Sequence, residues 1–251
     1  MCQLYFRTET SRPILHYQTD LALPQTDRFA IIDDDDTLTK LDKRLQAVAN
    51  RIRASTHADV GSDHGYLLRW LLSRRQIRRG IAIENKQQPF QHSQSVLAGY
   101  DVDVRLADGL HGLFDGEADS LSICGMGGRS IVRILSDLPD RVPQALVLQP
   151  NRDVDLVRSW GLRSGYHLID ECIADQNWSH QILQFRRATS TTDPAYKGLD
   201  QEAALIFGPL LLKRFEPTLA LRLQDERAYL NQFDKLGPKS SKRLAAINRI
   251  L

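Results

Sequence analysis

A run of small and acidic residues, Ala58-Asp59-Val60-Gly61-Ser62-Asp63-His64-Gly65-Tyr66, has the residue types and spacing of a ligand site. It predicts the end of a buried strand, a glycine turn and the start of a helix. Gly61 can adopt backbone angles closed to other residues, and it lets a ligand approach the main chain. Such turns bind nucleotide-like ligands in doubly wound sheets. The alternative is a structural turn with a helix-capping carboxylate.

The charge of this turn selects among nucleotide-like ligands. Asp59 and Asp63 would repel a diphosphate, and the turn lacks the Gly-x-Gly-x-x-Gly pattern of nicotinamide enzymes. A ligand with an ammonium group and a positive centre would be attracted, which indicates S-adenosylmethionine. The predicted cofactor residues of the turn are Asp59, Gly61, Ser62, Asp63, His64, Gly65 and Tyr66. His64 is either a ligand contact or a packed histidine.

Two further polar groups follow predicted strands, where ligands bind in such sheets. Glu84, after Ile81–Ile83, could accept from both ribose hydroxyls of an adenosine. The motif Asp108-Gly109-Leu110 follows the strand over 102–106; Asp108 could accept from the adenine amino group while Leu110 covers the ring. The alternatives are a solvent-exposed charge for Glu84 and an ordinary Asp-Gly turn for Asp108.

The loops after two later strands would face the methyl acceptor. Gly125, Met126 and Gly127 offer neither a carboxylate nor an aromatic ring, so main-chain groups must contact the target there. The alternatives are a plain glycine turn or a phosphate site at the following helix. The later run Gln149-Pro150-Asn151 carries amides able to read an adenine edge. Alternatively, Asn151 caps the helix that starts near Asp153.

Alternating strands and helices must position these residues. The predicted strands are Ala58–Val60, Ile81–Ile83, Val102–Leu106, Ser120–Cys124, Ala145–Gln149, His167–Ile173 and Gln181–Arg186. The predicted helices are 38–52, Tyr66–Arg75, Pro89–Ala98, Arg129–Ser136 and Asp153–Ser164. This alternation predicts an α/β fold with a doubly wound, Rossmann-like sheet. The last two strands leave no room for a helix between them and should pair antiparallel, a pattern typical of class I methyltransferases.

The chain divides into three predicted parts. Residues 1–37 form an irregular extension that ends in the acidic run Asp33–Asp36. Residues 38–189 form the S-adenosylmethionine-binding domain. Residues 199–251 form a small helical region of two or three helices, punctuated by Gly208-Pro209 and Gly237-Pro238.

Composition narrows the function further. The net charge is +2, and the three cysteines form no Cys-x-x-Cys pair, so we expect no metal site and a reducing cytoplasm. No apolar run reaches membrane-spanning length. A dense cationic cluster could hold RNA phosphates or complement a helix end: Arg74, Arg75, Arg78 and Arg79. The oligomeric state stays open, with a monomer as the working expectation.

Taken together, the motifs resemble the bacterial tRNA (adenine-N1)-methyltransferase family that modifies adenine 22 in the D-loop. The matching segments, spread over about residues 38–230, are Leu41-Asp42-Lys43-Arg44-Leu45, Gly61-Ser62-Asp63-His64-Gly65-Tyr66-Leu67, Pro89-Phe90, Asp108-Gly109-Leu110, Gly125-Met126-Gly127-Gly128, Leu148-Gln149-Pro150-Asn151 and Phe207-Gly208-Pro209-Leu210-Leu211-Leu212. The chain departs from the family in its N-terminal extension, in Gly65 where Ala is expected, and in a short C-terminal region.

The resemblance implies S-adenosylmethionine as cofactor, tRNA as partner, and methyl transfer to adenine N1. Asp63 would stabilise the cationic product, or would instead bind the methionine ammonium group. Asn151, or main-chain groups of Gly125, Met126 and Gly127, would orient the base. Two other functions stay open: a methyltransferase acting on rRNA, DNA or protein, and a non-catalytic scaffold that binds cofactor or RNA.

Overall fold

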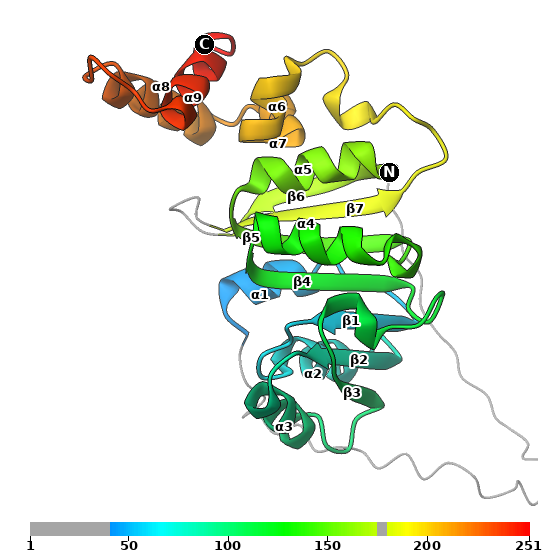
Figure 1. The fold of residues 1–251 in the computed structure, drawn as a ribbon. Helices are drawn as coiled ribbons and strands as arrows, with labels where there is room; N and C mark the ends of the chain where they lie inside the picture. Colours follow the sequence, from blue (N-terminus) through cyan, green and yellow to red (C-terminus); the bar gives the residue numbers. More distant parts are fainter. Residues whose placement is uncertain (1–40, 175–179) are drawn as a thin grey trace, which may run out of the picture. The chain divides into compact units, whose positions relative to one another are not determined.

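Seven strands form a single sheet in the order β3-β2-β1-β4-β5-β7-β6 (Figure 1). The computed structural model describes residues 41–174 and 180–251, so the predicted extension over 1–37 lies outside the described residues. The strands are β1 (Thr56–Val60), β2 (Arg79–Glu84), β3 (Val102–Leu106), β4 (Ser120–Gly127), β5 (Ala145–Arg152), β6 (Tyr166–Ile173) and β7 (Gln181–Arg187).

The order and direction of the strands confirm the predicted class I methyltransferase fold. Strands β1 to β5 pair in parallel, while β7 runs antiparallel to both β5 and β6. Strand β7 therefore inserts between its neighbours and leaves β6 at the edge. Because β1 and β4 are adjacent in the middle although they are not consecutive, the crossovers diverge there, which is where such sheets bind ligands.

Helices cover both faces of the sheet. They are α1 (Lys43–Ala49), α2 (Tyr66–Ser73), α3 (Gln87–Val96), α4 (Gly128–Asp137), α5 (Val154–Arg163), α6 (Gln201–Phe207), α7 (Pro209–Arg214), α8 (Pro217–Leu230) and α9 (Pro238–Asn248). Helices α4 and α5 pack on one face through Ile131, Leu135 and Trp160. Helices α1 and α2 pack on the opposite face through Val48 and Leu68.

Helix α1 is shorter than the predicted helix over 38–52. It begins at Lys43 because the side chain of Asp42 accepts a hydrogen bond from the Leu45 N–H at 2.7 Å, which caps the first turn. It ends at Ala49, and the chain then turns into β1. The beginning of α1 is thereby held beside the ends of β4 and β5, where Arg44 contacts Gln149.

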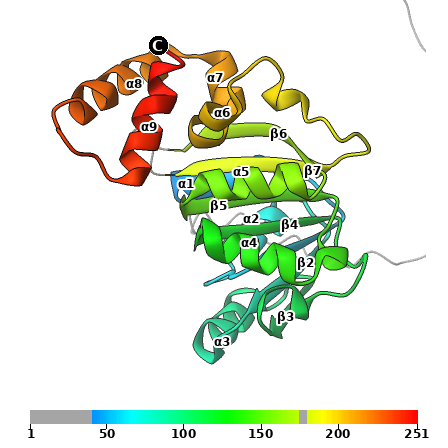
Figure 2. The ribbon, with the colours of Figure 1, turned by 45° about the horizontal axis from the view of Figure 1, so that its top comes forward.

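Four short helices follow the sheet, so the prediction of two or three is wrong (Figure 2). The reason lies in three prolines, Pro209, Pro217 and Pro238, each of which starts a new helix. Proline is well suited to the first helical turn, where its missing N–H has no partner to lose, but it interrupts a continuing helix. The boundary between predicted domains 38–189 and 199–251 stays a prediction.

A buried ion pair joins α6 and α7 to the sheet. Arg158 of α5 and Glu171 of β6 are fully buried, with Nη2 and Oε2 2.8 Å apart. Arg158 also donates to the Leu205 carbonyl at the end of α6, and Glu171 Oε1 accepts from the Leu210 N–H at the start of α7. A Cβ on Gly208 would lie 2.7 Å from Glu171 Oε1, so only glycine fits this turn.

Candidate active site

The turn after β1 is shaped by Gly61. Its φ is +72°, a region that favours glycine, and its N–H donates to the Ile83 carbonyl at 2.9 Å. A Cβ at this position would lie 2.4 Å from the Met126 methyl group. The turn therefore joins β1 to β2, and it also leaves room for Met126 from the loop after β4.

Asp63 uses its backbone to hold the turn and leaves its side chain in solvent. Its φ is +57°, which is uncommon for a residue other than glycine. Its N–H donates to the Glu84 carboxylate, and its carbonyl accepts from Ser93 Oγ at 3.3 Å. The side chain is 74% exposed and lies 3.6 Å from His64 Nε2. Asp63 is thus a fixed, accessible carboxylate at the predicted cofactor turn.

The second half of the turn starts α2. Gly65 has a φ of +70°, its N–H donates to the Ser62 carbonyl, and an added Cβ would lie 2.8 Å from Leu97. An alanine here would be both strained and crowded. Next to it the rings of His64, Tyr66 and His92 form a surface cluster, with the two histidine rings 4.4 Å apart.

Glu84 ends β2 as a buried acceptor. Its side chain is 4% exposed, and Oε1 has no hydrogen-bond partner among the described residues. Burial raises the pKa of Glu84 to about 7; the Asp63 N–H opposes this shift, and the charges of Asp59 and Asp63 add to it. A buried oxygen without a donor is costly, so the position suits a ligand that brings hydroxyl donors, such as a ribose.

Asp59 is a second buried carboxylate, in the middle of β1. Ser122 Oγ donates to Asp59 Oδ1 at 2.5 Å across the β1–β4 pair. Burial raises the pKa of Asp59 to about 6, while the Ser122 hydroxyl and the positive charge of Arg44 oppose that shift. Asp59 therefore adds negative charge beneath the cofactor turn.

The segment after β3 combines exposed polar groups with a leucine of the main core. Asp108 is exposed and lies 3.5 Å from Arg133 Nη1. Gly109 has a φ of +54° and begins a 3₁₀ turn over Gly109–Gly112. The Leu110 side chain is only 1% exposed and packs in the main core, where no ligand ring could lie against it. Asp108 and His111 are the exposed polar side chains here.

A closed set of hydrogen bonds holds the glycine loop, the irregular end of β4 over Gly125–Gly127. The register between β4 and β5 shifts around Gly125, whose φ is +75°. Gln149 Oε1 accepts from the Gly125 N–H at 3.0 Å and from Arg44 Nη1 at 2.8 Å. Gln149 Nε2 donates to Asn151 Oδ1 at 3.0 Å, and Asn151 Nδ2 donates to the Gly125 carbonyl at 2.6 Å.

Gly127 and Gly128 complete that loop and start α4. Gly127 is the N-cap, and a Cβ on it would lie 3.1 Å from Arg152 Nε. A Cβ on Gly128 would lie 2.2 Å from the Asp153 carbonyl oxygen, so the starts of α4 and α5 can approach only at a glycine. Arg129 follows at once, with 84% of its side chain exposed.

Comparison with known proteins agrees with this geometry. The family model described as tRNA (adenine(22)-N(1))-methyltransferase matches residues 57–249. The Bacillus subtilis (strain 168) protein of that description is 36% identical over 182 residues, which cover 69% of this chain and 76% of the relative. The chain belongs to the tRNA (adenine(22)-N(1))-methyltransferase family. The resemblance inferred from the sequence motifs is therefore confirmed.

Solved structures of the family have the same fold. The crystal structure of the Bacillus subtilis m1A22 tRNA methyltransferase has a TM-score of 0.70 and 30% identity, and covers 84% of this chain and 96% of that one. Streptococcus pneumoniae Sp1610 in complex with S-adenosyl-L-methionine has a TM-score of 0.70 and 29% identity, and covers 84% of this chain and 100% of that one. The second of these relatives was solved with S-adenosyl-L-methionine bound.

The predicted acceptor-side amides have different surroundings. Gln149 and Pro150 are buried, and both polar atoms of Gln149 bond within the protein. Asn151 is exposed, and its amide bonds to Gly125 instead of capping α5, whose N-cap Asp153 has no side-chain cap bond. Of the three, only Asn151 has an exposed side chain.

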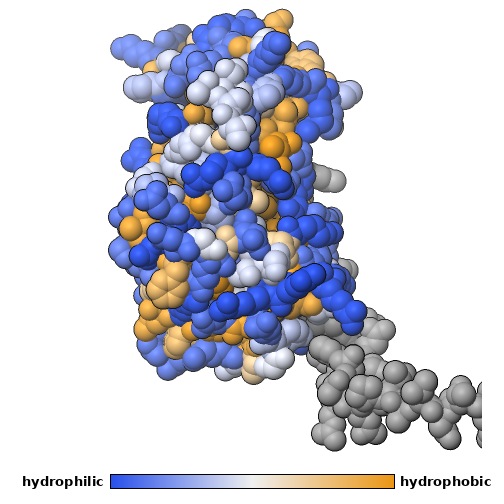
Figure 3. All heavy atoms as spheres, turned by 90° about the vertical axis from the view of Figure 1, so that its right-hand side faces the viewer, coloured by the Kyte–Doolittle hydropathy of each residue, from blue (hydrophilic) through white to orange (hydrophobic). Residues whose placement is uncertain are grey.

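The arginine cluster lies at the opposite edge of the sheet. Helix α2 leads the chain from the end of β1 back to the start of β2, so Arg74, Arg75 and Arg78 are near the amino ends of the strands. The N–H groups of Arg78 and Arg79 both bond to the Ser55 carbonyl just before β1. Arg74 stacks on Trp70, and Arg79 lies 3.8 Å from both Asp103 and Glu117. Because β7 is antiparallel to β5, its end lies at the amino edge of the parallel strands. Figure 3 faces this side of the molecule, and the surface there is mostly hydrophilic.

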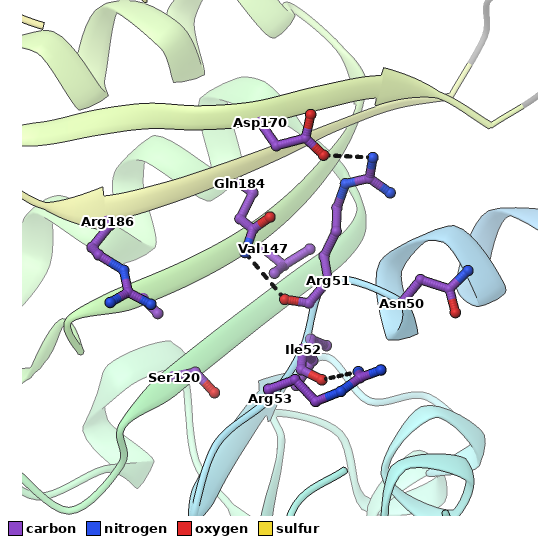
Figure 4. A pocket seen from close by; sticks show the side chains of 10 residues that line it. Asn50, Arg51, Ile52, Arg53, Ser120, Val147, Asp170, Gln184 and Arg186 are labelled. Carbon is purple, nitrogen blue, oxygen red and sulfur yellow. Dashed lines mark hydrogen bonds and ion pairs between the residues drawn. The ribbon is translucent and has the colours of Figure 1, made fainter. Parts of the chain in front are cut away.

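A cavity of about 490 Å³ is also far from the cofactor turn. Figure 4 shows it beside the segment that links α1 to β1, on the face of the sheet that α1 covers. Its lining is Asn50, Arg51, Ile52, Arg53, Ser120, Ala145, Val147, Asp170, Gln184 and Arg186. Since Ser120 and Ala145 begin β4 and β5, the cavity lies at the amino edge, away from the glycine turn.

Sequence reasoning missed Arg44 and Ser122 as site residues. Arg44 belongs to a helix face that the pattern marks as solvent-exposed, yet it contacts Gln149 and influences Asp59. Ser122 has no motif of its own. Its place in β4, three residues before Gly125 and on the face opposite Leu121 and Ile123, was the available signal.

Within residues 41–174 and 180–251, histidine, cysteine and carboxylate side chains form no group of three that could hold a metal ion. Over the same ranges, every helix is too short or too polar to cross a membrane.

Proposed function

We propose that this protein transfers the methyl group of S-adenosylmethionine to N1 of adenine 22 in the D-loop of tRNA. The observation that carries the proposal is the buried, unpaired Glu84 oxygen next to the Gly61 turn, in a chain of this methyltransferase family. S-adenosylmethionine, when bound, supplies an electrophilic methyl group on a sulfonium centre. The residues of the chain must hold it, present the adenine and stabilise the charge that moves to the base.

Three carboxylates and a guanidinium suit the polar groups of the cofactor. Glu84 would accept hydrogen bonds from the ribose hydroxyls, and Asp59 would attract the methionine ammonium group. Arg44 lies near Asp59 and would attract the methionine carboxylate. Asp108, exposed at the end of β3, would accept from the adenine amino group. Leu110 supports this end of the site by packing in the core.

The residues on the acceptor side would align the base. The neutral N1 of adenine has a lone pair that can attack the methyl carbon in line, so alignment supplies much of the acceleration. Asn151 is anchored through Gly125 and Gln149, and its second amide hydrogen is available for a base nitrogen. Main-chain groups of Gly125, Met126 and Gly127 would line the same place. Gln149 and Pro150 hold this loop instead of touching the base.

Asp63 would stabilise the cationic product. Its side chain is accessible, while its backbone is fixed by Glu84 and Ser93. A carboxylate near the ring opposes the positive charge that develops on N1-methyladenine. A target adenine in folded tRNA must be unpaired or flipped out of its stack to reach this position.

Cationic groups at the carboxyl edge would hold the tRNA backbone near the target. Arg129 and Arg152 flank the glycine loop and are exposed, and Lys239 of α9 lies 3.1 Å from Asp153 in the same neighbourhood. The cluster of Arg74, Arg75, Arg78 and Arg79 would serve only a part of the tRNA distant from the reacting base. The tRNA substrate and the free thiols of Cys124 and Cys172 agree with a cytoplasmic location.

Methyl transfer from labelled S-adenosylmethionine to unmodified tRNA tests the proposal, with the product nucleoside identified by mass spectrometry. N1-methyladenosine at position 22 is the expected product. Cofactor binding without incorporation would refute tRNA methylation, and trials with rRNA, DNA and protein would then separate another target from a scaffold role.

The tRNA affinity of two double variants tests the two RNA surfaces. Because each phosphate contact releases counterions, R129Q/R152Q should reduce the slope of log affinity against log salt by roughly 1 to 2. The matched variant R75Q/R78Q should change the slope less. An unchanged slope for R129Q/R152Q would contradict the assignment of the carboxyl-edge surface.

A further inference from the structure

A chain of buried hydrogen bonds runs behind the candidate cofactor site. His57, at the start of β1, is completely buried; its Nδ1 lies 2.6 Å from Ser120 Oγ and its Nε2 lies 2.8 Å from Ser122 Oγ. Ser122 Oγ in turn lies 2.5 Å from Asp59 Oδ1. All four side chains lie on the face of the sheet that α1 and α2 cover, because their neighbours in β1 and β4 point to the other core.

The number of protons on these four side chains determines which group donates each hydrogen bond. An ionised Asp59 has none, so Ser122 must donate its single hydroxyl proton to it. Ser122 can then only accept from His57, which must carry a proton on Nε2. A neutral imidazole has one proton, so Nδ1 accepts and Ser120 donates to it. Burial lowers the pKa of His57 to about 3, which agrees with a neutral ring.

We propose that His57 is a positioning residue that directs the Ser122 hydroxyl toward Asp59 and so keeps that carboxylate ionised for the ammonium group of the cofactor. This inference rests on the proposed role of Asp59. If the Ser122 hydroxyl did not donate to Asp59, the buried carboxylate would lack this hydrogen bond and would take up a proton more readily. A protonated Asp59 carries no charge to attract an ammonium group.

Other charges around Asp59 would not replace this hydrogen bond. Arg44 from α1 favours the ionised form, whereas Glu84 at the end of β2 is a like charge that disfavours it. Cys124 of β4 also faces Asp59, and burial raises the pKa of its thiol, so the thiol stays neutral. The Ser62 hydroxyl also lowers the pKa of Asp59, but less than Ser122 does, and Ser62 Oγ makes no hydrogen bond within the described residues. Ser122 therefore supplies the direct hydrogen bond to this carboxylate.

The Ser120 end of this series of hydrogen bonds lies at the cavity of Figure 4. Ser120 lines that cavity and bonds to His57, so the four side chains link the amino edge of the sheet to the cofactor turn. Because Ser120 is two hydrogen bonds further from Asp59 than Ser122 is, replacing it should have a smaller effect. The order of effects is therefore Ser122, then His57, then Ser120.

The pH dependence of S-adenosylmethionine binding tests the roles of Ser122 and His57 in the full-length protein. S122A should move the affinity loss on the acid side upward by roughly one to two pH units, since a hydrogen bond to a charged group is lost. H57L should shift it in the same direction but less, while S122T, which keeps the hydroxyl, should restore the wild-type curve. H111L, at an exposed histidine paired with Asp137, is the matched control. Unshifted curves for S122A and H57L would overturn the inference.

The tautomer of His57 gives a readout that does not depend on the cofactor. Long-range ¹H–¹⁵N correlation spectra at pH 8 should show the proton of His57 on Nε2, and H57L should identify the signal by its loss. A proton on Nδ1 would overturn the inference even if S-adenosylmethionine binds. If the wild-type protein binds no S-adenosylmethionine, the proposed function fails, and the tautomer still decides whether the hydrogen-bond chain has the assigned direction.

Discussion

The unpaired carboxylate of Glu84 makes the affinity for S-adenosylmethionine depend on pH. The ribose hydroxyls are donors, so they need the ionised form, whose pKa burial raises to about 7. With that pKa, about one molecule in eleven is ionised at pH 6 and about ten in eleven at pH 8. The contribution of Glu84 to the affinity of the wild-type protein should therefore rise about tenfold from pH 6 to pH 8 and level off above it.

Isothermal titration calorimetry at constant ionic strength would measure this rise. The variant E84Q keeps the shape of the side chain but has no titrating group, so its affinity should be lower at pH 8 and should lack the Glu84 part of the pH dependence. It also supplies the baseline, because Asp59 and the α-amino group of the cofactor titrate in the same range. A tenfold rise that persists in E84Q would refute the reasoning.

The same raised pKa has a stability consequence of opposite sign. A carboxyl group with a higher pKa in the folded state binds more protons when folded, so the cofactor-free protein loses stability as pH rises from about 4.5 to 7. The full shift corresponds to roughly 3 kcal/mol. E84Q should remove that loss and make the free protein more stable than wild type at pH 8, as urea unfolding would show. A less stable variant would contradict an unpaired charge.

Three further variants test the frame around the site. Both Gly61 and Gly116 have a positive φ, so an alanine at either position should cost roughly 1 to 2 kcal/mol. G61A should be less stable than the control G116A, because only a Cβ at Gly61 would also collide with Met126. Equal losses of stability in urea unfolding would contradict this close contact. R158M should destabilise by about 3 to 5 kcal/mol, since it leaves the Glu171 charge buried without its partner; a loss below about 1 kcal/mol in urea unfolding would refute a buried ion pair. N151A should lower kcat roughly tenfold to hundredfold through misalignment of the acceptor loop, with cofactor affinity nearly unchanged; steady-state kinetics showing only a KM effect would exclude an aligning role.

Local patterns predict much of this fold because each strand and helix has its own repeating signal. Apolar runs of the right length identify all seven strands, and the missing helix between the last two predicts their antiparallel pairing. Glycines that take a positive φ, such as Gly61 and Gly125, stand in motifs that the amino-acid sequence already displays. The strand ends then place Glu84 and Asp63 at one edge of the sheet.

The predictions that changed concern side chains whose partners are distant in sequence. Gln149 stands at a strand end and looks available, but Arg44, 105 residues earlier, and Gly125 occupy its oxygen. Leu110 follows an exposed Asp-Gly turn, but its side chain packs in the main core. The positive charge of the arginine cluster at 74–79 does not reveal at which edge of the sheet it lies. The cluster lies at the amino edge because α2 leads the chain back from the end of β1 to the start of β2.

By itself, the sequence determined the succession of strands and helices, the glycine turn and the family, because these depend on local spacing and on motifs that can be read in chain order. Only the tertiary structure decided which polar groups keep an unused hydrogen-bond donor or acceptor. Glu84 keeps a free oxygen while Gln149 keeps none, and His57 meets Ser122 across 65 residues. Burial and hydrogen-bond partners are properties of the packed sheet, so no single segment contains them.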